Sequence, residues 1–255
     1  MITFHSPSIK DTGTFKQLKD LNFFTSLNFN KVWREYLKFA TDRNRVIGDP
    51  VLRFGEGEIN VMGIRNNPEV SFNDEYNFYN DLLIIEHTIK ASQEFYIFKA
   101  TMDPKGKSNN IAHLLEGVYA SYTSLRPHKY MPGRTAIVQD KDSVLVTRTN
   151  SNGDIIKGMS EHEGLFGINI HDSGGYTNSS MGCTVLEKDS SENNFHWEKF
   201  FKPLIKTITN KADIDYIVIN KDAVIELARS AAYSATSSRS ILDKICFRIP
   251  FKYEI

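Results

Sequence analysis

Short apolar runs separated by polar, turn-forming segments dominate the middle of this chain. The runs are rich in Ile, Val, Tyr and Phe, and the segments between them are rich in Asn, Asp, Gly, Pro and Ser. This combination predicts β-strands joined by loops and hairpins, and therefore a β-rich core. The predicted strands are one or two within 51–65, then 82–88, 94–101, 117–122, 135–138, 143–149, 168–171, 183–186 and 216–219.

Apolar residues at helical spacing occur near both ends of the chain. The N-terminal set predicts a helix that begins after a cap at Asn28 or Asn30 and extends to about Asn44. We interpret its apolar face as packing on the core, although a partner-binding face has the same spacing. The other expected elements are helices over 197–208 and from an Asp222 cap to Ala232, an irregular 1–27 and an edge strand within 245–255.

The charge balance argues against two classes of partner. The 255 residues include 31 Lys and Arg and 31 Asp and Glu, so no basic excess favours nucleic acid or an anionic membrane. The apolar fraction of 40% is typical of a globular protein. No apolar run is long enough to span a bilayer, and residues 1–7 do not resemble a signal peptide. We therefore expect synthesis in the cytoplasm and no membrane span.

Two residues suited to nucleophilic catalysis lie on either side of one loop. His171 ends a strand-like alternation, and Cys183 begins the next apolar run. A nearby imidazole lowers the pKa of a thiol or accepts its proton. Each residue alone is more often structural, but the pair around one Gly- and Ser-rich loop favours catalysis. Gly182 lets the backbone approach a substrate carbonyl, so amides near it could form an oxyanion hole.

The cysteine and histidine counts limit the alternatives. Cys183 and Cys246 are the two cysteines, too few for a disulfide scaffold in a chain of this length. A bridge between them is possible, but it would inactivate a nucleophile, and we favour two free thiols with Cys246 as a buried apolar residue. The histidines form no ligand-spaced set with the cysteines, so we expect no metal and no cofactor.

The order of these motifs resembles the catalytic domain of the L,D-transpeptidase family. The run His171 … Ser180-Met181-Gly182-Cys183 is similar to that family's histidine, loop and Ser/Thr-x-Gly-Cys signature. The stretches 59–65, 81–85, 100–104 and 167–171 resemble strands of its phage-encoded and related bacterial members, so the resemblance spans roughly residues 55–190. It implies a mainly β fold, a β-sandwich or barrel, with helical additions at the N-terminal and C-terminal ends.

The resemblance also implies an activity on peptidoglycan stem peptides. Cys183 would attack an amide carbonyl, His171 would take the proton or stabilise the thiolate, and a thioester would form. An amine would resolve the thioester to a cross-link, and water would resolve it to a hydrolysed product. A backbone carbonyl or Asn169 could orient the imidazole, and Ser180 would support the loop or donate to the substrate.

Besides Asn169, which is also a candidate for binding substrate, three further residues are candidates for the substrate pocket. Arg65 could clamp a substrate carboxylate, because a guanidinium binds carboxylates bidentately, or it could form a surface salt bridge. His128 and Tyr130 lie in a predicted loop between strands, where binding groups are often presented and where solvated histidines are also common. The resemblance favours a substrate-binding role for all three.

The sequence departs from the family pattern around the acceptor site. The loop before Ser180 is shorter than usual, Met181 replaces a usual histidine, and Val185 replaces a usual Arg or Asn. These changes favour hydrolysis or another transfer over cross-linking.

We divide the chain into an N-terminal extension with one helix (1–50), an L,D-transpeptidase-like catalytic domain (51–190) and a C-terminal elaboration packed on it (191–255). Because no leader is expected, action on the cell wall would require phage lysis, a virion or a secretion system for delivery.

Two alternative functions stay open. One is a non-catalytic peptidoglycan-binding or phage structural protein with an inert Cys183. The other is an unrelated cysteine hydrolase that acts on proteins and uses His128 as its base.

Overall fold

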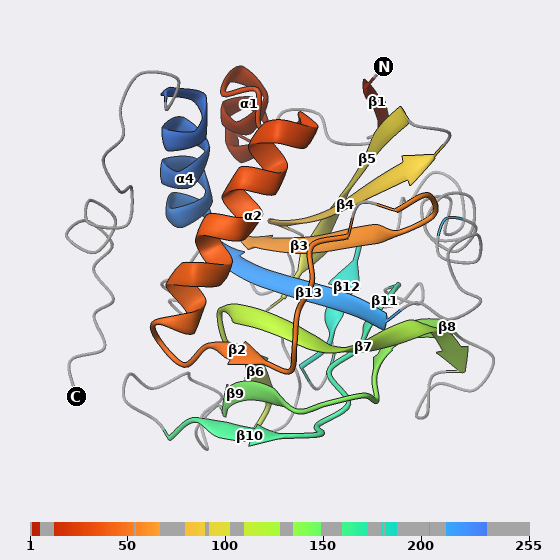
Figure 1. Cartoon of the computed structure of the whole chain (residues 1–255). Helices are drawn as coiled ribbons and strands as arrows, with labels where there is room; N and C mark the ends of the chain where they lie inside the picture. Colours follow the sequence, from red (N-terminus) through yellow and green to blue (C-terminus); the bar gives the residue numbers. More distant parts are fainter. Residues whose placement is uncertain are drawn as a thin grey trace.

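The fold is that of a computed structural model, which describes residues 2–5, 13–53, 55–66, 80–89, 92–102, 110–127, 135–148, 160–172, 180, 182–187, 204 and 213–233. Eight strands form a sheet that closes on itself as a barrel (Figure 1). Around the barrel they are β5 (Ser92–Thr101), β12 (Thr184–Leu186), β11 (Ile170–Asp172), β8 (Thr135–Gln139), β7 (Gly117–Pro127), β13 (Asp213–Asn220), β3 (Ile59–Arg65) and β4 (Asp81–Ile89).

Closure comes from the pairing of β4 with β5, which contain the predicted strands 82–88 and 94–101. The two strands pair from Asp81 opposite Ala100 to Ile89 opposite Ser92. Two short strands add to the barrel in parallel, β1 (Ile2–His5) on β5 and β2 (Val46–Ile47) on β7. The mainly β class expected from the alternation is therefore confirmed, and the sheet is a closed barrel.

A separate three-stranded sheet lies beside the barrel, with β9 (Val144–Arg148) between β6 (Ala112–Leu114) and β10 (His162–Gly164). Of these strands, the sequence pattern predicts only β9. The other two have three residues each, which is too short to show a recognisable alternation.

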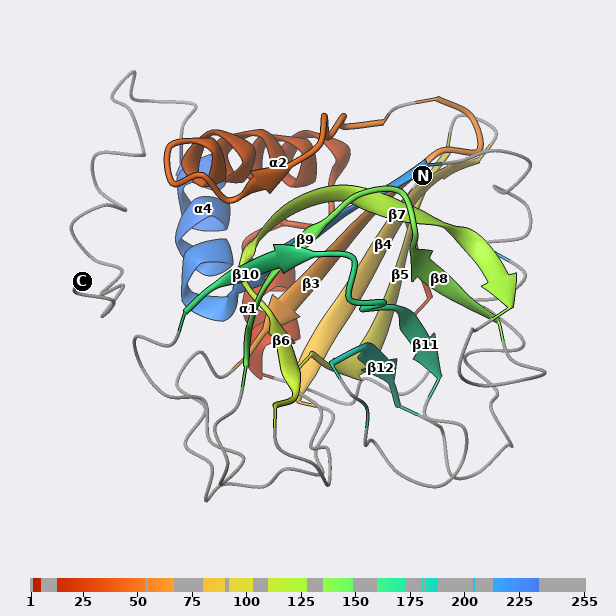
Figure 2. The same ribbon diagram turned by 90° about the horizontal axis from the view of Figure 1, so that it is seen from below.

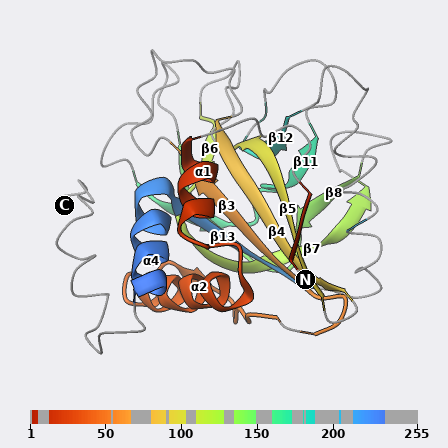
Figure 3. The same ribbon diagram turned by 90° about the horizontal axis from the view of Figure 1, so that it is seen from above.

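Helices α1 (Gly13–Asp20), α2 (Ser26–Thr41) and α4 (Lys221–Tyr233) gather on one side of the barrel (Figures 1 and 3). The cap predictions are wrong for both longer helices. The Thr25 side chain accepts the Asn28 N–H and caps α2. The Asn220 side chain accepts the Ala223 N–H at the start of α4, so Asp222 lies inside the first turn. Helix α1 forms within the stretch expected to be irregular.

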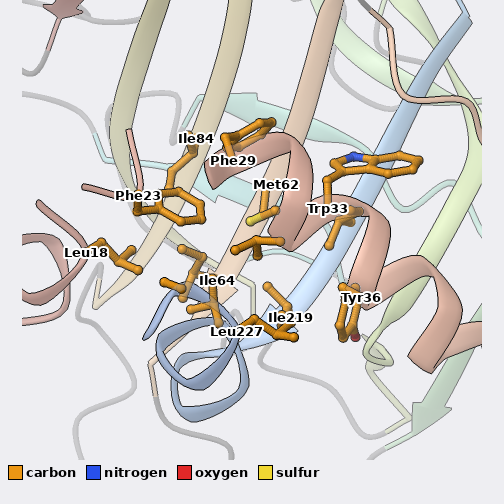
Figure 4. Packing of buried hydrophobic residues seen from close by; sticks show 14 of the residues in the cluster. Leu18, Phe23, Phe29, Trp33, Tyr36, Met62, Ile64, Ile84, Ile219 and Leu227 are labelled. Atoms are coloured by element: carbon orange, nitrogen blue, oxygen red, sulfur yellow. The ribbon is translucent and has the colours of Figure 1, made fainter. Parts of the chain in front are cut away.

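Two apolar cores lie on the two faces of the sheet. Along β3, Met62 and Ile64 pack against the helices (Figure 4), whereas Ile59 and Val61 point into the barrel. The interpretation of the α2 apolar face as core packing is confirmed, because its residues Val32, Trp33, Tyr36 and Ala40 are buried and Leu37 is partly buried against them.

The C-terminal region contributes a central strand. β13 lies between β3, to which it is parallel, and β7, to which it is antiparallel. Residues 213–220 are therefore part of the barrel wall itself. The helix expected over 197–208 lies outside the described residues apart from Leu204, and so does the edge strand expected within 245–255. Among the described residues no helix is both long enough and apolar enough to cross a membrane.

Candidate functional site

The two strands that carry His171 and Cys183 are direct neighbours in the barrel wall. β11 and β12 run parallel, with Ile170 opposite Thr184 and His171 opposite Val185. Figure 2 shows them together on the side of the barrel away from the helices. His171 is the middle residue of β11, and Cys183 is the residue directly before β12.

His171 and Val185 are partners in this register and therefore lie on the same face of the sheet. Cys183 lies two residues before Val185, directly before the first residue of β12. The imidazole and the thiol are thus carried by neighbouring segments, one at the centre of β11 and one at the entry to β12.

The Cys183 sulfur sits in a cradle of backbone groups. The free thiol donates to the Gly167 carbonyl oxygen at 3.5 Å, and the Asn169 N–H donates to the sulfur at 3.4 Å. The side chain is 8% exposed. Within the described part of the chain, no hydrogen bond joins this sulfur to His171. Catalytic pairs are often this loosely arranged before substrate binds.

Burial raises the pKa of the Cys183 thiol, and hydrogen bonds from Ser180 and from the Asn169 backbone lower it by less. This direction is opposite to the lowering expected from a nearby imidazole, because the sulfur is almost removed from water. The resting thiol is therefore neutral at physiological pH. Of the two roles considered for His171, accepting the proton during attack suits a neutral thiol better than stabilising a preformed thiolate.

The Cys183 backbone N–H is already hydrogen-bonded. It donates to Ser180 Oγ at 2.8 Å. An oxyanion hole that used this amide would require a substrate oxygen to replace the serine hydroxyl. The Ser180 hydroxyl thus links Ser180 to Cys183, the residue directly before β12.

The surroundings of position 182 require a glycine there. Its φ of +131° lies in a region that side chains disfavour, and a Cβ there would collide with the Ala112 carbonyl oxygen of β6. The sequence led us to expect that the backbone at Gly182 approaches a substrate carbonyl. In the structure it approaches the Ala112 carbonyl of β6 instead.

The His171 imidazole is 2% exposed and is oriented by the backbone. Nδ1 lies 2.6 Å from the Asp172 carbonyl oxygen. A carbonyl can only accept, so Nδ1 carries the proton and Nε2 is the basic nitrogen of the neutral ring. Of the two orienting groups considered from sequence, the backbone carbonyl is the one seen.

Asn169 and Arg65 are both buried, and each binds backbone of the protein. Asn169 Oδ1 accepts from the Gln139 N–H at 3.0 Å. Arg65 ends β3 and donates from Nη2 to the Leu114 carbonyl oxygen at 2.8 Å. Leu114 lies two residues from Ala112, about 7 Å along β6, so Arg65 and Gly182 approach the same short strand.

The remaining candidates cannot be placed. His128, Tyr130 and Cys246 lie outside the described residues. Within the described ranges, no group of three or more His, Cys, Asp and Glu side chains is arranged to hold a metal ion.

Comparisons of the chain with protein-family models, with curated proteins and with solved structures find no match.

The sequence gives no signal for the backbone groups that shape this site. The carbonyls of Gly167 and Asp172 and the Asn169 N–H act through the main chain, so their residue types do not identify them. Gln139 is a polar residue directly after the predicted strand 135–138. That position is the one sequence feature that points to its place next to residues 164–169.

Proposed function

We propose that this protein is a cysteine-dependent enzyme of the L,D-transpeptidase type that acts on peptidoglycan stem peptides. The observation that carries the proposal is the placement of Cys183 directly before β12, the parallel neighbour of the strand β11 that carries His171. Buried surroundings at both residues strengthen electrostatic interactions during reaction.

The reaction would begin from the neutral pair. Nε2 of His171 accepts the thiol proton while Cys183 Sγ attacks an amide carbonyl carbon of the stem peptide. The C–N bond then breaks, the proton passes from His171 to the leaving amine, and a thioester is left on Cys183. The Asp172 carbonyl stabilises the imidazolium formed in between, because it accepts from Nδ1.

Water is the favoured acceptor for the thioester. Val185 lies opposite His171 on the same face and is fully buried, so the residue beside the imidazole presents methyl groups. An Arg or Asn in that position would offer hydrogen bonds to an acceptor peptide, and this chain lacks them. Hydrolysis, or transfer to a small acceptor, needs no such contact.

Mass spectrometry of the intact protein tests this function. A Cys246→Ser variant incubated with purified muropeptides should gain the mass of the acyl fragment, and hydroxylamine should remove it. A Cys183→Ser, Cys246→Ser control should gain nothing. Absence of both adduct and cleaved product from every stem peptide tried would remove the enzymatic proposal.

One observation favours a second candidate, a non-catalytic peptidoglycan-binding or phage structural protein. The Cys183 thiol is buried with a raised pKa, and its N–H is held by Ser180, as in a residue that only packs. Such a protein would co-sediment with cell-wall sacculi equally well with and without Cys183, and would form no adduct.

A further inference from the structure

Gln139, the last residue of β8, has a side chain buried among backbone groups and only 5% exposed. Its Oε1 accepts from the N–H groups of Phe166 and Ile168, at 3.1 Å each. Its Nε2 donates to the carbonyl oxygens of Asp142 and Gly164, at 3.1 and 3.0 Å. The carboxamide therefore uses both of its donor hydrogens and both acceptor positions on protein backbone.

The main chain of Gln139 adds a contact to the same segment. Its N–H donates to Asn169 Oδ1 at 3.0 Å. Side chain and backbone together fix the stretch from Gly164 to Asn169. This stretch carries the two backbone groups that touch the Cys183 sulfur, the Gly167 carbonyl and the Asn169 N–H.

We propose that Gln139 is a positioning residue for the Cys183 nucleophile, because it clamps the segment 164–169 that forms the cradle of the sulfur. The inference rests on the proposed function, since it assigns Gln139 a part in the reactivity of that cysteine. It goes further in naming a residue that touches neither sulfur nor imidazole and still controls ionisation of the thiol.

The two groups in the cradle act on different protonation states. The Gly167 carbonyl can only accept, so it holds the neutral thiol through its S–H. The Asn169 N–H can only donate, so it stabilises the sulfur as the proton leaves. A segment released from Gln139 would let this donor move away, and the thiol would ionise less readily.

Only a carboxamide of this length makes all four side-chain bonds. Glutamate at this position keeps the shape and the Oε1 acceptor, but it offers no donor to Asp142 or Gly164 and brings a buried charge. Methionine keeps the length and makes none of the four. A purely structural clamp would stabilise the fold without affecting the thiol, and this difference is measurable.

The test is alkylation of Cys183 by iodoacetamide from about pH 6 to about pH 10 in a Cys246→Ser background. The midpoint of the rate profile reports ionisation, and its plateau reports access to the thiol. Gln139→Met and Gln139→Glu should each move the midpoint up by about one pH unit and slow alkylation about tenfold below it, the effect of losing one hydrogen bond to a thiolate.

Asn60→Leu is the matched control. Asn60 is also a buried amide, with bonds to the Arg53 backbone and to Glu86, near the opposite end of β3 from Arg65. It should lower resistance to urea comparably and leave the Cys183 midpoint unchanged. Gln139→Asn, which keeps a shorter carboxamide, is the further variant if the other two do not fold, and it should shift the midpoint in the same direction.

An unchanged midpoint in folded Gln139 variants, or a higher plateau alone, would overturn the inference. Failure of the proposed function looks different. In that case the parent profile would not respond to a His171→Ala change, whatever the Gln139 variants do. A parent that depends on His171, with Gln139 variants identical to it, would reject the role of Gln139 alone.

Discussion

Nδ1 of His171 and the carbonyl oxygen of Asp172 lie 2.6 Å apart, and this contact decides which ring nitrogen can act as a base. The carbonyl belongs to the next residue in the chain, so no other side chain is needed to fix the tautomer. With Nδ1 protonated, Nε2 is the nitrogen able to accept the Cys183 proton.

Replacement of Gly182 by alanine should be among the most destabilising changes in the chain. The new Cβ would meet the Ala112 carbonyl and lie 2.8 Å from Ile168 Cδ1, at a φ of +131°. We expect a loss of about 3 kcal/mol or more in the free energy of unfolding, measured in urea. Gly57→Ala is the control, because Gly57 also has a positive φ but no atom within 4 Å, and it should cost about 1 kcal/mol. Equal losses would mean that crowding by β6 does not matter.

Ser180→Ala should make Cys183 harder to ionise. The hydroxyl lowers the pKa of the thiol and accepts the Cys183 N–H at 2.8 Å. Without it, the thiol pKa should rise, and alkylation at a fixed pH below that pKa should slow about three- to tenfold. Ser180→Thr keeps the hydroxyl and should behave like the parent. Faster alkylation in the alanine variant, with an unchanged midpoint, would show that Ser180 only restricts access.

Tyr122→Phe should not destabilise the protein. The Tyr122 side chain is fully buried, and its hydroxyl has no hydrogen-bond partner in the part of the chain that the structure describes. Removing an unsatisfied buried hydroxyl is neutral or stabilising, by up to about 1 kcal/mol. Tyr216→Phe is the comparison, because that hydroxyl is paired with Thr184 Oγ1 at 3.0 Å and its removal should cost about 1 kcal/mol. A clear loss in Tyr122→Phe, measured by thermal unfolding, would reveal a partner for this hydroxyl.

Stability should fall in mildly acidic solution because of His87. Burial lowers the pKa of this histidine, while Glu94 and Glu56 raise it by less, and neither ring nitrogen has a hydrogen-bond partner among the described residues. The unfolded chain takes up a proton at about pH 6.5, whereas the folded protein does so only at lower pH. The contribution of the neutral His87 ring to the free energy of unfolding is therefore fully present above about pH 6.5. It is lost as the pH falls below that value, by at most about 1.4 kcal/mol per pH unit.

Urea unfolding at about pH 7.5 and about pH 5.5 checks this slope. His87→Leu should be less dependent on pH than the parent over that interval, because it has no proton to take up. A parent and a His87→Leu variant with the same slope would contradict the assignment.

Most strands were predictable because apolar runs and apolar–polar alternation are local properties of the sequence. One of these two patterns is present in each run that became β4, β5, β7, β8 or β13 of the barrel, and in the run that became β9 beside it. The parallel pairing of β11 with β12 was not predictable, since it depends on how the intervening chain returns. The caps were misassigned because Thr25 and Asn220 have competing Asn and Asp neighbours of similar capping strength.

For the site, the sequence motifs predicted which side chains are reactive but not the protonation state of the thiol. His171 lies in β11 and Cys183 directly before the neighbouring strand β12, and their pairing as base and nucleophile stays a prediction. The direction of the Cys183 pKa shift depends on burial by residues far along the chain, which no short motif encodes. The cradle that Gln139 fixes consists of main-chain groups and leaves no compositional trace.

The most direct measurement of the central claim is the pH dependence of Cys183 alkylation in a Cys246→Ser protein, compared with the same protein carrying His171→Ala. If His171 is the base for this thiol, the parent should react at least about tenfold faster than the variant near neutral pH. The two rates should converge where the thiol ionises unaided, at or above about pH 8.5. Identical profiles across the whole range would contradict the pairing of Cys183 with His171 and leave the cysteine as a packing residue.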